Sequence, residues 1–221
     1  MDLRIISVFE NLAPDALDRI EKQCSLRTFE KDAEILGEQE NTTDVFFVLD
    51  GTVRVTSFTS VGREVIYSDI PAGNIFGEFS AIDQLPRSTS VVALTDCKLA
   101  RMSSAAFFAV LRENSEVCVH LVQLLVAKMR SMSERVFEVS ALAVRERLRR
   151  ELLRLALASG KQDQQGVIIR PAPTHYEIAA RIGSHREAVT REMNRLEQEK
   201  LLETGRKSIR ITDLRKLRMG P

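Results

Sequence analysis

The stretch THYEIAARIGSHREAVTREMNRLEQEKLLE, residues 174–203, has the pattern of two short helices joined by a tight turn. Thr174 and Glu177 form a capping box at the start of the first helix, and Ser184 repeats it with the glutamate three residues later. Gly183 stands between the helices, where the turn needs a residue that tolerates positive φ. The stretch therefore predicts a helix-turn-helix.

The second helix of this motif has one apolar and one polar face. Val189, Met193 and Leu196 face inward, and Arg and Glu lie on the outward face. In a DNA major groove, Arg can donate two hydrogen bonds to guanine and Glu can accept one from the cytosine amino group. The basic segment GRKSIRI then predicts a small hairpin that touches phosphates as a wing. The predicted DNA-binding residues are Thr174, His175, Ser184, His185, Arg186, Glu187, Thr190, Arg191 and Arg206.

The charge distribution agrees with this DNA hypothesis. Residues 171–221 hold eleven Lys/Arg and seven Asp/Glu, a net charge of +4, whereas the remainder holds twenty-one and twenty-four, a net charge of −3. A basic C-terminal part favours a polyanionic partner. A helical hairpin with a solvated charged face is the alternative.

Composition excludes several other classes. No run approaches the about 18 apolar residues of a membrane span, and the start lacks a signal-peptide pattern, so we expect a cytoplasmic protein. The cysteines Cys24, Cys97 and Cys118 are far apart, and no histidine pair has metal-binding spacing. We therefore expect no disulfide scaffold and no metal.

A long helix is predicted from about Glu113 to Leu142, followed by a second helix, RERLRRELLRLALAS, that ends at Gly160. The polar loop KQDQQG and a short strand, VIIRPAP, come next. Apolar residues of the long helix recur at alternating intervals of three and four, which is typical of a coiled-coil seam and predicts a parallel homodimer. The alternative is a helix packed on its own core. The predicted seam is Val122, Leu125, Met129, Met132, Val136, Val139 and Ala143.

The first half of the chain is predicted to be rich in strands. Residues from about 20 to 110 read as short strands with Gly/Pro turns, which favours a small barrel or jelly roll, and the first 20 residues look helical. VFFVLDGTVRVTSF predicts a hairpin at Asp50-Gly51. The stretch FGEFSAIDQLPRSTSVVA, residues 76–93, carries Glu78 and Arg87 among strand and turn residues, and we expect both to face a bound anion.

The order of β-roll, long helix and winged helix-turn-helix resembles the CRP/FNR family of bacterial transcription regulators over nearly the whole chain. GSHREAVTREMNRLEQEKLL resembles its turn and recognition helix, and FGE followed nine residues later by Arg-Ser resembles its cyclic-nucleotide phosphate cassette. The resemblance implies an α+β fold in three parts. These are a β-roll (jelly-roll) cyclic-nucleotide-binding domain at 1–112, a coiled-coil dimerisation helix at 113–143 and a winged helix-turn-helix DNA-binding domain at 144–221.

The resemblance also implies roles for residues of the cassette. Glu78 accepts from the ribose 2′-hydroxyl, Arg87 grips the phosphate, as a planar guanidinium does well, and Ser88 donates to it. Without a ligand, Arg87 could pair with Glu78, and a purely structural ion pair is the alternative. The implied ligand-binding residues are Gly77, Glu78, Phe79, Ser80, Arg87, Ser88, Met132 and Ser133, the backbone amides after Gly77 serving as donors and Ser133 reaching the partner's nucleotide.

For DNA, the resemblance implies that Arg186, Glu187 and Arg191 select a palindromic TGTGA-like operator. It further implies a homodimer, double-stranded DNA and RNA polymerase as partners, and no membrane. Two competing hypotheses remain. One is a regulator of the same fold that binds DNA without a cyclic nucleotide or with another effector. The other is an enzyme that hydrolyses a cyclic nucleotide. Such an enzyme needs a metal cluster or an activated nucleophile, and the sequence shows neither.

The chain departs from the family pattern at two places. Met132 stands where cAMP-dependent members have a threonine that bonds adenine, so the effector is expected to be cAMP, with cGMP possible. Gln39 stands where the family often has a glycine, with Gly37 two residues earlier, which predicts a rearranged turn.

Overall fold

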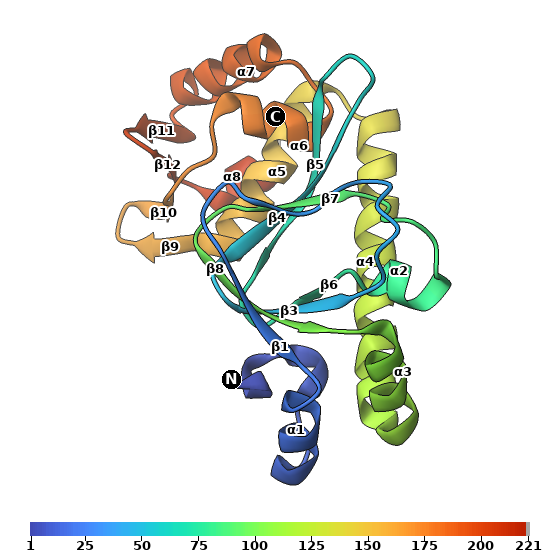
Figure 1. Ribbon diagram of the computed structural model, residues 1–221. Coiled ribbons are helices and arrows are strands. Elements are labelled where there is room, and N and C mark those ends of the chain that lie inside the picture. The colour runs from blue at the N-terminus through green and yellow to red at the C-terminus, as the bar shows by residue number, and fades with distance from the viewer. Residues whose placement is uncertain (220–221) are drawn as a thin grey trace. The chain divides into compact units, whose positions relative to one another are not determined.

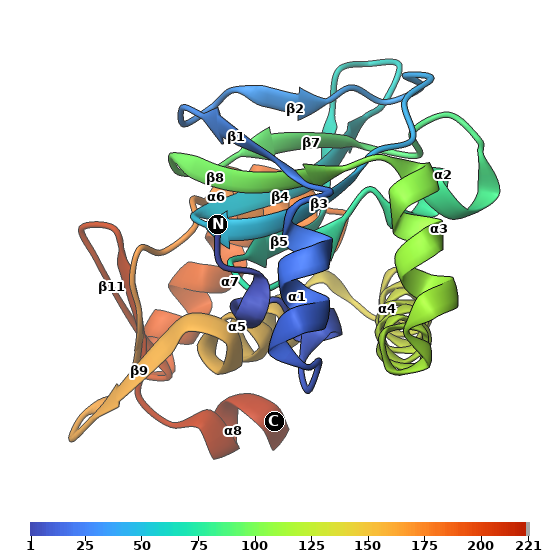
Figure 2. The ribbon, with the colours of Figure 1, turned by 60° about the horizontal axis from the view of Figure 1, so that its bottom comes forward.

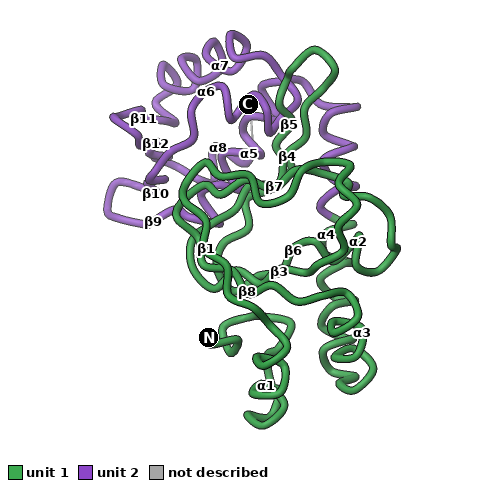
Figure 3. The backbone as a smooth tube through the Cα atoms, viewed as in Figure 1, with its two compact units in different colours: residues 1–130 green, residues 131–221 purple. Residues whose placement is uncertain are grey.

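The computed structural model describes residues 1–219 and divides into two compact units, residues 1–130 and 131–221 (Figure 3). The predicted long helix is present as α4, Ser115–Ala141, and the boundary between the units falls inside it. No helix of the described part of the chain combines the length and the apolar character needed to span a bilayer.

The first unit contains two four-stranded antiparallel sheets, with strand orders β1-β8-β3-β6 and β2-β7-β4-β5 (Figures 1 and 2). Apart from β4 and β5, consecutive strands lie in different sheets, which is the arrangement of a jelly roll and confirms the predicted β-roll. The strands are β1 Ser25–Phe29, β2 Glu34–Leu36, β3 Val45–Asp50, β4 Thr52–Phe58, β5 Glu64–Pro71, β6 Ile75–Phe76, β7 Ser90–Ala93 and β8 Cys97–Met102.

The predicted hairpin at Asp50-Gly51 is wrong. Strand β3 pairs with β8 and β6, and β4 pairs with β5 and β7, so the chain changes sheet at Gly51. Gly51 has φ 86°, and a Cβ there would lie 2.3 Å from the backbone oxygen of Asp96. The turn glycine is therefore required, but for a corner between sheets. The hairpin lies one turn later, between β4 and β5.

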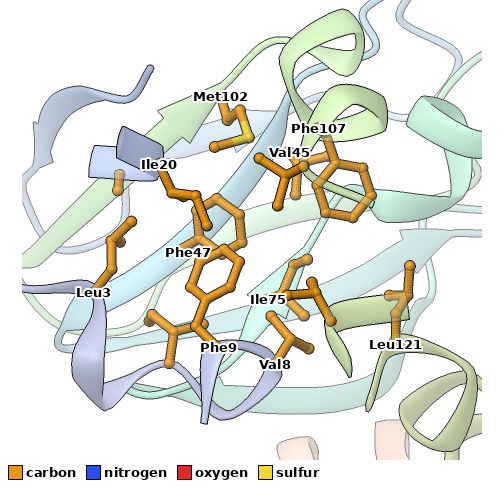
Figure 4. Close-up of a cluster of buried hydrophobic side chains, with 14 of the residues drawn as sticks. Leu3, Val8, Phe9, Ile20, Val45, Phe47, Ile75, Met102, Phe107 and Leu121 are labelled. Carbon is orange, nitrogen blue, oxygen red and sulfur yellow. The ribbon is translucent and has the colours of Figure 1, made fainter. Parts of the chain in front are cut away.

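Helices flank these sheets and complete the core. The N-terminal segment is helical as predicted, and Figure 4 shows Phe9 and Phe47 in the centre of the cluster, with ring centroids 4.9 Å apart. Leu121 of α4 reaches the same cluster, which anchors the first half of α4 to the β-roll. The helices of this unit before α4 are η1 Leu3–Ile5, η2 Ser7–Phe9, α1 Pro14–Glu21, α2 Glu78–Asp83 and α3 Ser104–Glu113.

The exposed apolar stripe on α4 differs from the predicted seam at Leu125, and the last predicted seam residue, Ala143, lies beyond the end of α4 at Ala141. Leu125 is partly buried and packs against the core of the first unit, whereas Val126 is 39% exposed. The sequence pattern could not separate these neighbours because both are apolar. The exposed stripe along α4 consists of Val119, Val122, Val126, Met129, Met132, Val136, Phe137 and Val139.

The second unit holds the last turns of α4, a helical cluster and a small sheet with strand order β11-β12-β10-β9. Its core contains Leu148, Ile178 and Val189. KQDQQG, predicted to be a loop, instead forms most of strand β9 and the turn to β10. The elements are α5 Val144–Ser159, β9 Gly160–Asp163, β10 Gly166–Ile169, α6 His175–Ile182, α7 Arg186–Gln198, β11 Leu202–Gly205, β12 Ser208–Ile211 and α8 Leu214–Met219.

Candidate functional site

The cassette of the first unit is built around the start of α2. Gly77 precedes the helix with φ 81°, in the left-handed region that suits glycine. A Cβ at this position would lie 2.8 Å from the backbone oxygen of Asp44 and 2.9 Å from Nη1 of Arg87. Gly77 thus allows both the turn and the close approach of the arginine.

Arg87 is 2% exposed and is held by neighbouring protein groups. Its Nε donates to the Thr42 hydroxyl at 2.9 Å, Nη1 to the Gly77 carbonyl at 2.9 Å and Nη2 to the Asp44 carbonyl at 2.8 Å. Burial lowers the pKa of this guanidinium, and the nearby carboxylate of Asp44 opposes that shift. Two carbonyls and one hydroxyl accept its hydrogen bonds, and the nearby carboxylates favour its charged form.

The turn that receives Arg87 contains Gln39. This residue itself adopts φ 68°, and its N–H donates to the Arg87 carbonyl at 2.9 Å. The Arg87 N–H donates in turn to the Glu40 carbonyl at 2.9 Å. The residue that replaces the family's usual glycine therefore occupies the left-handed region itself, next to the cassette arginine.

Glu78 does not pair with Arg87, so the ion pair expected for the ligand-free protein is wrong. Its carboxylate is 2% exposed, and Oε1 accepts from Nζ of Lys128 on α4 at 2.6 Å. The same ammonium lies 5.8 Å from the ring centroid of Phe79. The reason is geometric: Arg87 turns toward the backbone of Gly77 and Asp44, and α4 supplies the cation that the buried carboxylate needs.

Lys128 is the functional candidate that sequence reasoning missed. In the sequence it reads as one of the charged residues that flank the apolar seam of the long helix. A signal existed, because Lys128 and Met132 are four residues apart and so share a helix face. Fifty residues separate Lys128 from Glu78, and local patterns cannot pair residues at that distance.

The other predicted ligand residues divide into two groups. The structure brings Gly77, Glu78 and Arg87 together, with Ser80 buried and Ser88 exposed nearby in the chain. Met132 and Ser133 lie on the part of α4 that belongs to the second unit. Within residues 1–219, no group of three or more His, Cys, Asp or Glu side chains is arranged to hold a metal ion.

In the second unit, the first helix of the predicted motif is confirmed as α6. Thr174 accepts from the Glu177 N–H at 3.2 Å, and the Glu177 carboxylate accepts from the Thr174 N–H at 2.8 Å, which completes the capping box. Gly183 ends the helix with φ 62°. The predicted cap at Ser184 is wrong by one residue, because α7 begins at Arg186 with His185 in the N-cap position, and Ser184 is buried.

Helix α7 has the predicted two faces. Val189, Met193 and Leu196 are buried. The side chains of His185, Arg186, Glu187 and Arg191 are exposed, and those of the last three make no hydrogen bond or ion pair to the residues that the structure describes. An exposed row of unpaired donors and acceptors is available for an outside partner.

Three further predicted DNA residues have partners or a defined place. The Thr190 hydroxyl donates to the Arg186 carbonyl at 2.9 Å and lies 2.9 Å from Nδ1 of His175, so this pair ties α6 to α7. The predicted basic hairpin is present as β11 and β12, with Arg206 exposed in the turn. Helix, turn, helix and hairpin together form a winged helix-turn-helix.

Two family models match the chain in the same order as these two sites. The model for the cyclic nucleotide-binding domain matches residues 26–114, and the model for the Crp-like helix-turn-helix domain matches residues 146–219. The chain is 23% identical over 210 residues to the CRP-like cAMP-activated global transcriptional regulator of Mycobacterium tuberculosis, covering 95% of this chain and 94% of that protein. It is 28% identical over 195 residues to the cAMP-activated global transcriptional regulator CRP of Haemophilus influenzae, covering 87% and 86%.

Solved structures give the same fold at low identity. A CooA mutant from Carboxydothermus hydrogenoformans has a TM-score of 0.82 at 20% identity, covering 99% of this chain and 96% of that one. The c-di-GMP responsive global regulator CLP of Xanthomonas campestris has a TM-score of 0.80 at 18% identity, covering 91% and 100%. With both domain models matched in order, the chain belongs to the CRP/FNR family, whose members are bacterial DNA-binding transcription regulators and not enzymes.

Proposed function

We propose that this regulator is a homodimer that binds a palindromic, TGTGA-like operator when cAMP occupies the cassette around Gly77. The observation that carries the proposal is the joint burial of Glu78 and Arg87 beside Gly77, with Glu78 bonded to α4. A buried carboxylate and a buried guanidinium at one glycine turn suit the two ends of a ribose phosphate. The bond to Lys128 gives such a ligand a route to the long helix.

The donors and acceptors left over at the cassette fit this ligand. A guanidinium has five N–H groups, and three of those of Arg87 make the bonds described above, so two remain for phosphate oxygens. Oε1 of Glu78 accepts from Lys128, which leaves Oε2 for a ribose hydroxyl. Ser88 is exposed and offers a further hydroxyl. The residues thus fit a cyclic nucleotide without a metal.

The sugar phosphate is proposed from hydrogen-bonding groups, whereas the base is proposed from a packing contact. Met132 cannot accept or donate the hydrogen bond that a threonine makes to adenine. Its thioether can still pack against a purine ring. We propose cAMP, and cGMP is the competing nucleotide that a titration must include.

For dimerisation, the exposed apolar stripe of α4 supports a parallel helix pair. Within the first unit the stripe runs through Val119, Val122, Val126 and Met129, at intervals of three, four and three. Apolar side chains at these intervals are exposed in a monomer and are covered by the same helix of a second copy. The two recognition helices of such a dimer would enter successive major grooves about 34 Å apart.

The second candidate is a regulator of the same fold whose effector differs or is absent. It is favoured by the three bonds that already hold Arg87 and by the variety of known relatives, one of which is c-di-GMP responsive. The two candidates share the fold and the DNA site. They differ only in what fills the cassette.

Calorimetric titration separates the two candidates. The full-length protein is titrated with cAMP, cGMP and c-di-GMP, together with the variants Glu78→Gln and Ser88→Ala. Our proposal expects cAMP to bind, and each variant to weaken it by about tenfold or more, because a hydrogen bond to a charged group contributes about 1.5–3 kcal/mol. No heat with cAMP or cGMP, or equal affinity in all variants, would reject the cassette as their site. Ala141→Ser, exposed on α4, serves as the control.

A further inference from the structure

The C-terminus of α6 is held by two arginines from other helices of the second unit. Nη1 of Arg135 on α4 donates to the Arg181 carbonyl at 3.0 Å. Nη1 of Arg147 on α5 donates to the Ile182 carbonyl at 2.6 Å and to the Gly183 carbonyl at 3.3 Å. Three successive carbonyls at a helix end, which lack donors within their own helix, thus receive guanidinium donors.

Arg135 also lies beside a buried carboxylate. Its Nη2 lies 3.8 Å from Oε2 of Glu151, whose side chain is 2% exposed. The same carboxylate accepts from Nε of Arg154 at 3.0 Å and lies 3.8 Å from Nη1 of Arg181. Because Glu151 belongs to α5 and Arg181 to α6, one carboxylate connects α4, α5 and α6.

A second buried carboxylate, three residues after Arg135 on α4, connects α4 to α5. Glu138 is 4% exposed, and its two oxygens accept from Nη1 and Nη2 of Arg154 at 2.7 and 2.9 Å. Such a bidentate pair is the strongest form of arginine–carboxylate contact and fixes orientation as well as distance. Breaking one partner of a buried pair leaves an uncompensated charge, so the arrangement resists small displacements.

The last turn of α4 also comes close to the turn itself. A Cβ at Gly183 would lie 3.5 Å from Cγ2 of Val139 and 3.5 Å from Nη1 of Arg147. The end of α4 therefore adjoins the residue that sets the turn between α6 and α7.

From these contacts we propose that Arg135 and Arg147 are positioning residues of the helix-turn-helix, and that residues 131–141 of α4 form one body with α5 and α6. The break between α4 and α5 at Leu142 and Ala143 is then bridged by side chains and does not act as a free hinge. Any change imposed on α4 beyond Arg130 is transmitted directly to the turn before the recognition helix. This consequence for DNA rests on the proposed function.

The full-length variants Arg135→Gln and Arg147→Gln test the proposal, with Arg130→Gln as the control. Arg130 is exposed on the same helix and makes no hydrogen bond or ion pair to the described residues. Two quantities are measured: hydrogen exchange of the amides of residues 180–187, and the affinity ratio between operator and scrambled duplexes at one salt concentration. Arg135→Lys, which keeps one donor, should recover part of both.

We expect both glutamine variants to speed exchange at residues 180–187 at least tenfold, without a change at residues 1–130. The affinity ratio should fall at least tenfold, whereas mere loss of folded protein would lower both affinities and leave the ratio unchanged. Unchanged exchange at residues 180–187, or an effect equal to that of Arg130→Gln, overturns the proposal. If the wild-type protein shows no operator preference, the proposed function fails, and the exchange result alone decides the positioning role.

Discussion

Replacing Arg87 by leucine tests how far the cassette arginine supports the β-roll itself. The substitution removes the donors to the carbonyls of Gly77 and Asp44, which lie at 2.9 and 2.8 Å, and to the exposed Thr42. A buried acceptor that loses its donor costs about 1–3 kcal/mol. Two such carbonyls give at most about 2–6 kcal/mol. The Gly77 carbonyl keeps a long bond from the Ala81 N–H at 3.4 Å, and removal of a desolvated cation offsets a further part. We expect a net loss of about 3 kcal/mol in the free energy of unfolding.

Urea unfolding followed by far-ultraviolet circular dichroism measures this loss, since the chain has no Trp. With an m-value of about 2 kcal/mol/M, the midpoint should fall by about 1.5 M. Ser88→Ala, an exposed neighbour, should change stability by less than about 0.5 kcal/mol. Arg87→Lys should lie between, because one ammonium cannot reach three acceptors in different directions.

A leucine variant as stable as the wild type would refute this reasoning. It would mean that the three bonds contribute nothing and that Arg87 can turn to a phosphate at no cost. The predicted loss of stability also bears on ligand assays, because a nucleotide-binding defect in Arg87→Leu would then mix lost contacts with lost structure. Ser88→Ala, at an exposed residue, is therefore the cleaner variant for affinity measurements.

Three other outcomes follow from the structure. Gly77→Ala should lower the melting temperature more than Gly62→Ala, since both have positive φ but only Gly77 has atoms within 3 Å of the added Cβ; equal shifts would contradict the steric argument. Val126→Cys should form a disulfide dimer on oxidation and Leu125→Cys should not, because Leu125 packs on the core; the reverse on non-reducing gels would restore the predicted seam. DNA affinity should fall at least about a thousandfold between 50 and 200 mM salt if six or more phosphates are contacted; a flat dependence in anisotropy titrations would exclude this mode.

The sequence predicted best those features that depend on neighbouring residues. The Thr174–Glu177 capping box and the turn at Gly183 need only a few residues in succession, and the structure has both. The prediction of a hairpin at Asp50-Gly51 was wrong because a turn signal shows where the chain bends and not which strand the next strand pairs with. Strand partners are chosen by the packing of the whole β-roll, and a local pattern carries no information about them.

Within the candidate site, the predicted residues do lie close together, but their bonding could not be predicted from the sequence. Glu78 and Arg87 are both buried beside Gly77, yet each has a different partner from the expected one. The partner of Glu78 comes from a helix fifty residues away, and those of Arg87 are mainly backbone carbonyls that every residue carries. Pairing Glu78 with Arg87 by charge was therefore wrong, because a sequence does not show which backbone carbonyls accept hydrogen bonds.

We propose that a cyclic nucleotide controls operator binding. The most direct measurement is the fluorescence anisotropy of a labelled palindromic duplex, with TGTGA half-sites one helical turn apart, titrated with the protein in the presence and absence of cAMP and of cGMP. We expect at least about tenfold tighter binding with cAMP, a coupling of about 1.4 kcal/mol, which Glu78→Gln abolishes. Identical affinity with and without either nucleotide would contradict it.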